Sequence, residues 1–407
     1  MTFKQKYIIL FILGGLTALA PFSIDMYLPA FPSIAKSLNT EISKVTLSLT
    51  SYFLGISFGQ LIYGPVTDKF GRKKPLLFGL SLFAIAAIGC ALSTSINQLI
   101  IMRVILALGG CVGMVVSRAI VRDLFPTSEI AKIFSTLMLI VGVAPIIAPT
   151  IGSWVVVNYS WNMIFYILSA NALALLVAVY FFLPESRKPD PSKSLKIKNV
   201  LKDYKKVLSD KTFLFYAFIG SVASGGLFSY ISGSSFVFIE YFGMKEADFG
   251  IIFGLNAFGY ILGTQFNRLL LNKFSSFQII KSATFFLFVV SLGLISLLFL
   301  DQFSVFLLVG LLFSFLFILG ILSPNSTAMA LTPFSENAGS ASAMIGFTQM
   351  FCGAIWSVLV STLHDETLFP MIFGLVSAAI IVFVIVLKLD DTMKKGKLMP
   401  YQIKIEN

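Results

Sequence analysis

Charged residues are scarce in this sequence of 407 residues, since Asp, Glu, Lys and Arg together make up only 12% of it. A soluble globular domain carries about 25% charged residues, because its surface must be hydrated. Hydrophobic residues make up 57% of the chain, so most of its outer surface must face an apolar environment. The scarcity of charge therefore excludes an ordinary soluble domain.

Histidine and cysteine are also nearly absent. The single histidine, His364, excludes any site that needs a histidine pair. The three cysteines, Cys90, Cys111 and Cys352, lie inside apolar runs without metal-like spacing, and we interpret them as small core residues. We find no nucleophile–base pair and no phosphate-binding loop. We therefore expect no enzymatic activity, no metal and no cofactor.

The net charge of +11 would suit a nucleic-acid-binding protein, but the basic residues are confined to short segments between apolar runs. Such placement is typical of the cytoplasmic loops of membrane proteins. We therefore expect the chain to partner with a lipid bilayer and not with a nucleic acid.

Twelve apolar runs are long enough for membrane helices, which need about 20 apolar residues each. Helices are required because the hydrocarbon core cannot satisfy free backbone groups. The expected spans are 7–30, 45–66, 75–94, 97–117, 131–157, 161–183, 212–239, 248–267, 277–300, 303–331, 338–362 and 367–388. The stretch 277–331 is nearly continuous and divides only at Asp301-Gln302.

The distribution of Lys and Arg predicts the orientation. With the N-terminus inside, 26 of the 30 basic residues lie in cytoplasmic segments or at their edges, Lys36, Lys44 and Lys245 lie outside, and Arg103 lies within a span. The first run, at 24 residues, is too long for a cleaved signal peptide. We expect both termini in the cytoplasm and, from the short loops, a bacterial plasma membrane.

Residues 184–211 form the longest segment between spans and contain nine basic residues, four acidic residues and three prolines. We expect a cytoplasmic linker between an N-terminal half (1–183) and a C-terminal half (212–390), with a cytoplasmic tail at 391–407. A short amphipathic helix from Leu195 to Leu208 is expected in the linker. It either lies on anionic lipid or is simply solvated, and we favour the second alternative.

The segment Gly64-Pro-Val-Thr-Asp68-Lys-Phe-Gly71-Arg72-Lys-Lys follows the second span in a short cytoplasmic turn. Gly71 permits a positive φ, and Gly64 permits close approach of a neighbouring helix. Asp68 can bind a cation or a helix N-terminus and hold the helices in one arrangement. We interpret Gly64, Asp68, Gly71 and Arg72 as a conformational latch. The corresponding segment of the second half, 267–274, lacks the acid.

Only two formally charged residues, Asp25 and Arg103, lie well inside the expected spans. Placing a charged side chain in the bilayer costs at least about 2.5–3.5 kcal/mol, so we interpret such a residue as functional. Both residues lie about five or six residues from the outer end of their spans, hence at similar depth. We expect Asp25 to bind and release a proton and Arg103 to bias its charge. The alternative is a fixed structural ion pair.

Two other spans carry helix-packing patterns. Gly109 and Gly113 predict close packing after Arg103. In span five, Pro145 and Pro149 each remove a backbone hydrogen bond and predict a kink that Gly142 and Gly152 flank. At the inner end of span four, Arg118, Arg122 and Asp123 are either topology determinants or parts of the mechanism.

Two six-helix halves joined by a basic linker resemble the architecture of major facilitator transporters, whose halves rock about a central site. The 64–74 turn resembles the signature of that superfamily between helices two and three. The glycine and proline pattern at 142–152 resembles the motif of its exporters, and Arg103 with its glycines resembles a pattern linked there to proton transfer.

Three further segments narrow the resemblance to multidrug exporters of the Bcr/CflA type. Residues 19–30 resemble the first helix of that group, 118–125 its fourth and 230–242 its seventh. Ser235 stands where a proline is usual, and Thr17 is neutral where some relatives have a second acid. The resemblance implies an all-α major facilitator fold and export of small amphipathic compounds in exchange for protons.

Aromatic and amide side chains are expected to line a permissive substrate pocket. The candidates are Phe22, Tyr27, Tyr52, Phe53, Tyr230, Asn256, Phe258, Gln349 and Phe351. We expect a drug/proton antiporter that works as a monomer. The alternative is a dedicated exporter of an amino acid, short peptide or other metabolite, and a membrane enzyme or sensor is more remote.

Overall fold

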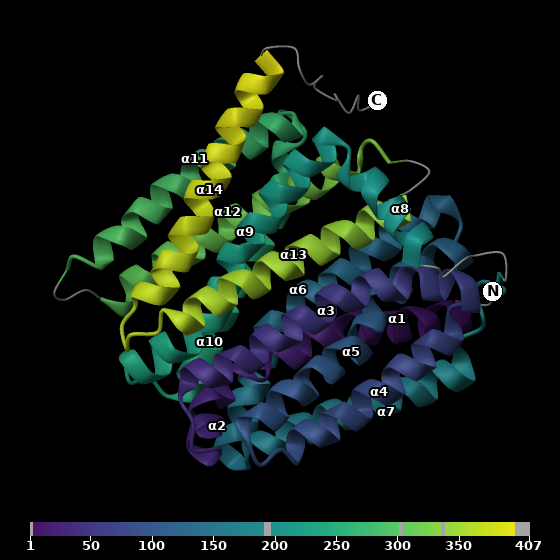
Figure 1. Cartoon of the computed structure of the whole chain (residues 1–407), viewed down its shortest axis with the longest axis horizontal. Coiled ribbons are helices and arrows are strands. Elements are labelled where there is room, and N and C mark those ends of the chain that lie inside the picture. The colour runs from purple at the N-terminus through teal and green to yellow at the C-terminus, as the bar shows by residue number, and fades with distance from the viewer. Residues whose placement is uncertain (1–2, 191–196, 301–303, 335–337, 395–407) are drawn as a thin grey trace. The chain divides into compact units, whose positions relative to one another are not determined.

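The computed structural model describes residues 3–190, 197–300, 304–334 and 338–394, and in these ranges it is helical without a strand. Figure 1 shows the helices in chain order. Twelve of the described segments are long and apolar enough to cross a membrane. The prediction of an all-α chain with twelve spans is therefore confirmed.

The helices of the first half of the chain follow the predicted spans closely. They are α1 (Phe3–Asp25), η1 (Leu28–Ala30), α2 (Phe31–Ser37), α3 (Ile42–Phe70), α4 (Lys73–Ala91), α5 (Ile96–Leu124), α6 (Thr127–Asn158) and α7 (Trp161–Phe182). The helices of the second half are α9 (Lys211–Ser235), η2 (Phe236–Tyr241), α10 (Glu246–Leu270), α11 (Ser276–Leu297), α12 (Val305–Leu331), α13 (Ala338–Thr362) and α14 (Phe369–Lys394).

The first span is the main departure from the expected helices. We expected one helix over 7–30, but α1 ends at Asp25, and a 3-10 turn and α2 complete the span. Pro29 and Pro32 lie in the segment that follows α1, and a proline cannot donate the backbone hydrogen bond that would continue a helix. The span is therefore discontinuous at residues 26–30.

The linker contains the amphipathic helix α8 (Ile197–Leu208), with Tyr204 and Val207 buried. Its predicted start at Leu195 lies outside the described residues, as do Asp301 and Gln302, where we expected α11 and α12 to divide. Leu201 and Leu208 of α8 are exposed.

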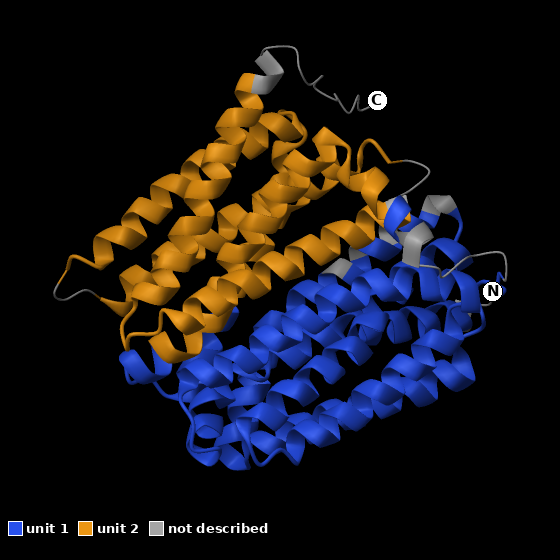
Figure 2. Cartoon of the chain, in the orientation of Figure 1, with its two compact units in different colours: residues 1–202, 238–254 blue, residues 203–237, 255–407 orange. Residues whose placement is uncertain are grey.

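The chain divides into two compact units, which Figure 2 colours separately. Unit 1 comprises residues 1–202 and 238–254, and unit 2 comprises residues 203–237 and 255–407. The short segment 238–254 therefore groups with unit 1, although it follows the linker in sequence. We predicted the halves at 1–183 and 212–390 from the order of the membrane spans and the position of the linker, and these boundaries stay a prediction.

Glycines bring the helices of unit 1 into close contact, as expected for α5. A Cβ on Gly109 would lie 2.5 Å from the backbone nitrogen of Phe83 in α4, and one on Gly113 would overlap the carbonyl of Leu16 in α1. Helix α5 therefore packs backbone against backbone with its neighbours, in the way that small residues permit in membrane helices.

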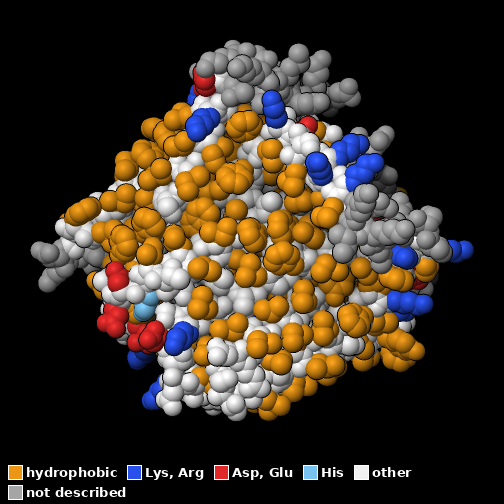
Figure 3. All heavy atoms as spheres, viewed as in Figure 1, with side chains coloured by type: hydrophobic (Ala, Val, Ile, Leu, Met, Phe, Trp, Pro, Cys, Tyr) orange, Lys and Arg blue, Asp and Glu red, His pale blue; other side chains and the backbone are white. Residues whose placement is uncertain are grey.

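Hydrophobic side chains cover much of the face seen in Figure 3, while charged side chains gather at its margins. Large exposed apolar residues include Phe11, Phe78, Phe181 and Phe306. A soluble protein rarely exposes extended apolar surface. The surface therefore agrees with a multi-pass membrane protein.

Candidate transport site and charge network

Asp25 is the last residue of α1 and lies directly at the discontinuity of the first span. Its residue exposure is 4%, and it is the one acid among the buried polar residues that the structure describes. The turn after it packs on α6, where a Cβ on Gly152 would overlap the carbonyl of Met26. Gly152 thus permits the chain to turn beside Asp25.

Arg103 is fully buried in α5 and reaches the same end of α1. Its Nη1 donates to the carbonyl of Ser23 at 2.9 Å and to the Ser23 hydroxyl at 3.2 Å. The Ser23 carbonyl is among the last four of α1, which have no partner inside the helix. Arg103 therefore caps the C-terminal end of α1.

Aromatic rings surround the Arg103 guanidinium. Its Cζ lies 4.4 Å from the ring centroid of Tyr27, 4.2 Å from that of Tyr52 and 5.9 Å from that of Phe165. The Tyr27 hydroxyl forms a hydrogen bond of 2.6 Å with Ser48 Oγ in α3. Cation–π contacts of this kind contribute roughly 0.5–2 kcal/mol each and partly offset the cost of burying the charge.

Asp25 and Arg103 are both buried in unit 1, but no ion pair joins them in the part of the chain that the structure describes. The alternative of a fixed ion pair is therefore wrong for this structure. Whether Arg103 biases the charge of Asp25 stays a prediction.

Pro145 and Pro149 lie inside the long helix α6, together with Gly142 and Gly152. This helix also packs closely on the first turns of α10, which belong to the same unit. A Cβ on Gly250 would lie 3.3 Å from the carbonyl of Pro149, and the Ser153 hydroxyl donates to the carbonyl of Glu246 at 2.7 Å. We expected the glycines beside the kink to permit contact with a helix from the second half of the sequence. Gly152 instead contacts Met26 of the first span, and the contact with α10 is made through Pro149 and Ser153.

The turn between α3 and α4 is held by a network of charges centred on Arg72, which is 4% exposed. Arg72 Nη1 donates to Asp68 Oδ1 at 2.8 Å, and Arg72 Nε donates to Asp123 Oδ2 of α5 at 2.9 Å. Asp68 therefore has the cationic partner that we expected. Asp123 belongs to this network and is more than a topology determinant.

The start of the linker completes the network, which the sequence did not reveal. Arg187 Nη1 donates to Asp68 at 3.3 Å. Glu185 accepts from the backbone N–H of Arg72 at 2.7 Å and from that of Lys73 at 3.2 Å, where α4 begins. A carboxylate stabilises a helix N-terminus by satisfying free N–H groups and by its charge. An acid and a base just after span six are the only sequence signal.

Gly71 and Gly64 differ in the structure. Gly71 has a φ of +84°, as predicted, and a Cβ there would lie 2.8 Å from Glu185 Oε2. At Gly64 no described atom lies within 4 Å of the position of a Cβ. The expected close approach at Gly64 is therefore wrong for this structure, because α3 faces open space at that residue.

The predicted pocket residues fall into separate groups. Tyr27 and Tyr52 surround Arg103 in unit 1, where Phe22 is half-buried in α1. In unit 2, Asn256 Nδ2 donates to the Tyr230 hydroxyl at 3.1 Å, and both residues are buried.

Gln349 of unit 2 is half-buried in α13. Its Nε2 would lie 3.7 Å from a Cβ on Gly220 of α9. A shared pocket formed by these residues stays a prediction.

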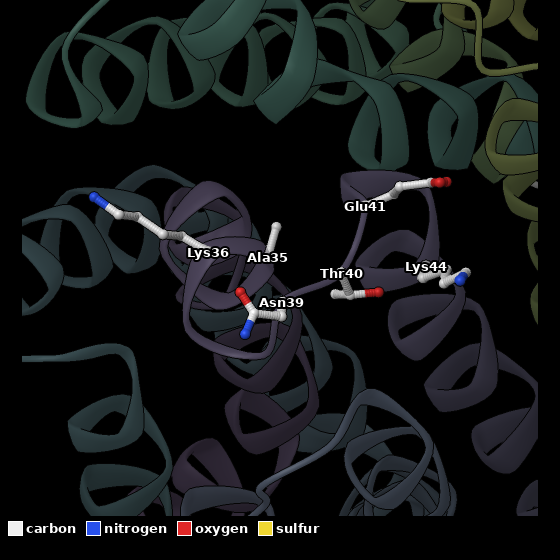
Figure 4. Close-up of a pocket in the computed structure, with 6 residues that line it drawn as sticks. All are labelled: Ala35, Lys36, Asn39, Thr40, Glu41 and Lys44. Carbon is white, nitrogen blue, oxygen red and sulfur yellow. The ribbon is translucent and has the colours of Figure 1, made fainter.

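One open pocket lies elsewhere in unit 1, beside α2 and the start of α3 (Figure 4). It is lined by Ala35, Lys36, Asn39, Thr40, Glu41 and Lys44. None of the predicted pocket residues is among them. Among the described residues, no group of three His, Cys, Asp or Glu side chains could hold a metal ion.

Comparisons with known proteins agree with this architecture. Residues 13–358 match the sequence profile of the Major Facilitator Superfamily. An uncharacterized MFS-type transporter of Bacillus subtilis (strain 168) is 34% identical over 376 residues, covering 91% of this chain and 92% of that protein. A bicyclomycin resistance protein homolog of Haemophilus influenzae is 32% identical over 93% of this chain and 95% of that protein.

More distant relatives share the same length and fold. Multidrug resistance protein MdtL of Escherichia fergusonii is 26% identical over 90% of this chain and 92% of that protein. The crystal structure of a bacterial homolog of the human lysosomal transporter Spinster superposes with a TM-score of 0.71 at 12% identity, covering 98% of this chain and all of that one. The profile match and the full-length relatives show that the chain belongs to the major facilitator superfamily.

Proposed function

We propose that the protein is a proton-coupled exporter of small amphipathic compounds, a drug/proton antiporter. The observation that carries this proposal is the buried carboxylate of Asp25 at the discontinuity of the first span. Discontinuous helices form the binding sites of many secondary transporters. A carboxylate held inside the membrane region is able to gain and lose a proton as its surroundings change.

Two relatives support the substrate class, because they are named for bicyclomycin resistance and multidrug resistance. Resistance of this kind requires outward transport. The distribution of basic residues supports cytoplasmic termini, and the bacterial relatives support a bacterial plasma membrane. We propose that one chain is sufficient for transport and that the protein catalyses no covalent reaction.

The charge network acts in this proposal as a latch. Asp68, Gly71, Arg72 and Asp123 tie α3, α4 and α5 together, and Gly142, Pro145, Pro149 and Gly152 shape α6 beside the discontinuity. A latch changes the equilibrium between transport states and affects the turnover of all substrates alike. Gly64 contributes to it only in a state where a helix approaches that face.

The test is efflux from a host without its own drug pumps. We expect cells that express the chain to export several unrelated amphipathic drugs and to stop doing so when a protonophore dissipates the proton gradient. Export of one amino acid or peptide alone would favour the dedicated metabolite exporter. Export that persists after the gradient collapses would contradict proton coupling.

A further inference from the structure

The guanidinium of Arg103 has one edge that is buried but meets no hydrogen-bond acceptor in the part of the chain that the structure describes. Nη1 is bound to Ser23, but Nε and Nη2 donate no hydrogen bond within the described part of the chain, although both are buried. The ring of Tyr52 lies over the same guanidinium, with its centroid 4.2 Å from Arg103 Cζ. Two unsatisfied donors of one buried side chain therefore lie inside unit 1.

The position of the two free nitrogens defines the chemistry of this edge. Nε and Nη2 present parallel N–H groups in the plane of the guanidinium, a geometry that matches the two oxygens of a carboxylate. An unpaired buried charge is costly, whereas a bidentate carboxylate satisfies both donors at once. The rings of Tyr27 and Tyr52 provide no such acceptor for these two nitrogens.

Asp25 is badly placed to supply this carboxylate. Arg103 binds the carbonyl and the hydroxyl of Ser23, two residues before Asp25 on the same helix. Side chains two positions apart on an α-helix point about 200° apart around its axis. The guanidinium therefore lies on the Ser23 side of α1, and no ion pair joins it to Asp25 in the described part of the chain.

We propose that the Nε and Nη2 edge of Arg103 binds the carboxylate of a transported compound, so that amphipathic carboxylic acids form a substrate class of this exporter. The proposal rests on the proposed function, because the ligand is a transport substrate. Asp25 then carries the proton and Arg103 recognises the substrate.

The test uses matched pairs of compounds that differ only in this group. Purified full-length protein in proteoliposomes is assayed with a series of N-acetyl amino acids, each paired with its uncharged amide, and with ethidium as a substrate that lacks a carboxylate. We expect the wild type to prefer at least some acids over their amides roughly ten- to a hundredfold. We expect Arg103→Ala to lower efflux of the acid more than efflux of its amide or of ethidium, so that the preference for the acid is lost.

Arg103→Lys guards against a folding defect, since it retains the charge without the planar fork. We expect Arg103→Lys to remain monodisperse and to show only part of the wild-type preference for the acid. Equal loss of ethidium and acid efflux in Arg103→Ala and Arg103→Lys would assign Arg103 to coupling or structure and overturn the proposal.

Two further outcomes separate the explanations. In binding assays we expect Asp25→Asn to retain the preference for the acid. If Asp25 itself occupies the edge, Asp25→Asn will change the affinity for the acid and for the amide alike. That result overturns the proposal. A wild type that exports ethidium but never prefers an acid also overturns it. A wild type that exports no probe contradicts the proposed function instead.

Discussion

Unit 1 and unit 2 bury polar side chains of different kinds. Unit 1 buries the charged residues Asp25, Arg72 and Arg103. The buried polar residues described in unit 2 are neutral hydroxyls and amides, which bond in pairs such as Ser221–Thr348 and Ser232–Ser357. Among the described residues, the buried acidic and basic side chains therefore lie in unit 1. The buried polar side chains of unit 2 can form hydrogen bonds but carry no charge.

The same difference is found where the second membrane helix of each half of the sequence ends, at the end of α3 and at the end of α10. In unit 1 the turn after α3 is fixed by Arg72 between two carboxylates. In unit 2 the buried amides of Asn267 and Asn325 form a hydrogen bond of 2.6 Å. Hydrogen bonds to charged groups contribute about 1.5–3 kcal/mol and neutral ones about 1 kcal/mol. The stronger and more directional network is therefore in unit 1.

The largest effect is expected from neutralising Asp25. Asp25→Asn should abolish proton-driven efflux, at least tenfold below the wild type for every substrate, because the amide cannot bind and release the proton. The matched change in unit 2 is Asn256→Ala, which removes a buried polar group but no charge. It should lower the rate or affinity and leave the dependence on the proton gradient intact. Both variants are compared in proteoliposomes with an imposed pH gradient.

A large effect is also expected at Gly152. Gly152→Val places a branched side chain against the carbonyl of Met26, and overpacking of this kind costs typically 1–3 kcal/mol. We expect a lower melting temperature and more than tenfold slower efflux. Gly310→Val in α12 is the control, because no atom lies within 4 Å of a Cβ there. If the two variants have equal melting temperatures, Gly152 does not shape the discontinuity of the first span.

Changes in the charge network of Asp68, Arg72 and Asp123 should slow transport by an intermediate factor that is the same for every substrate. Arg72→Gln should slow turnover about tenfold because it breaks ion pairs with Asp68 and Asp123. Asp68→Asn should have a smaller effect, because the carboxylate that pairs with Arg72 and Arg187 is partly exposed to solvent, which weakens an ion pair. Apparent affinities, measured on detergent-purified protein, should stay within about twofold. Asn325→Ala in unit 2 is the neutral counterpart, and selective loss of one substrate in Arg72→Gln would place the turn in recognition.

Gly71→Val tests the geometry of the same turn. A β-branched residue is strained at a φ of +84°, and its side chain would meet Glu185. We expect slower turnover of all substrates with unchanged affinity. A variant as active as the wild type would show that the position of the turn is not coupled to transport.

The smallest effect is expected at Glu185. Glu185→Gln keeps hydrogen-bonding groups at the start of α4 but removes the charge, which is worth about 0.3–1 kcal/mol at a helix N-terminus. We expect turnover to fall two- to fivefold. A fall as large as that of Arg72→Gln would show that the linker controls the turn more strongly than its contacts suggest.

Apolar runs were sufficient to predict the twelve spans, because the length of a membrane helix is set by bilayer thickness. The turn at Gly71 was also predictable, since glycine, acid and base stand at fixed spacing. The end of α1 at Asp25 was not predicted, because Met26 to Ala30 extend the apolar run and we gave the length of that run more weight than Pro29, which cannot continue the helix. The contacts of Glu185 and Arg103 depend on tertiary packing between distant segments, which no local pattern encodes.

The most direct test of the account is proton release on substrate binding. Detergent-purified wild type, Asp25→Asn and Asn256→Ala are mixed with a substrate in weakly buffered solution, and the pH change is recorded with a dye that is not itself a substrate. The account predicts proton release by the wild type and by Asn256→Ala, and substrate binding without release by Asp25→Asn. Release by Asp25→Asn equal to that of the wild type would contradict the assignment of the proton to unit 1 through Asp25.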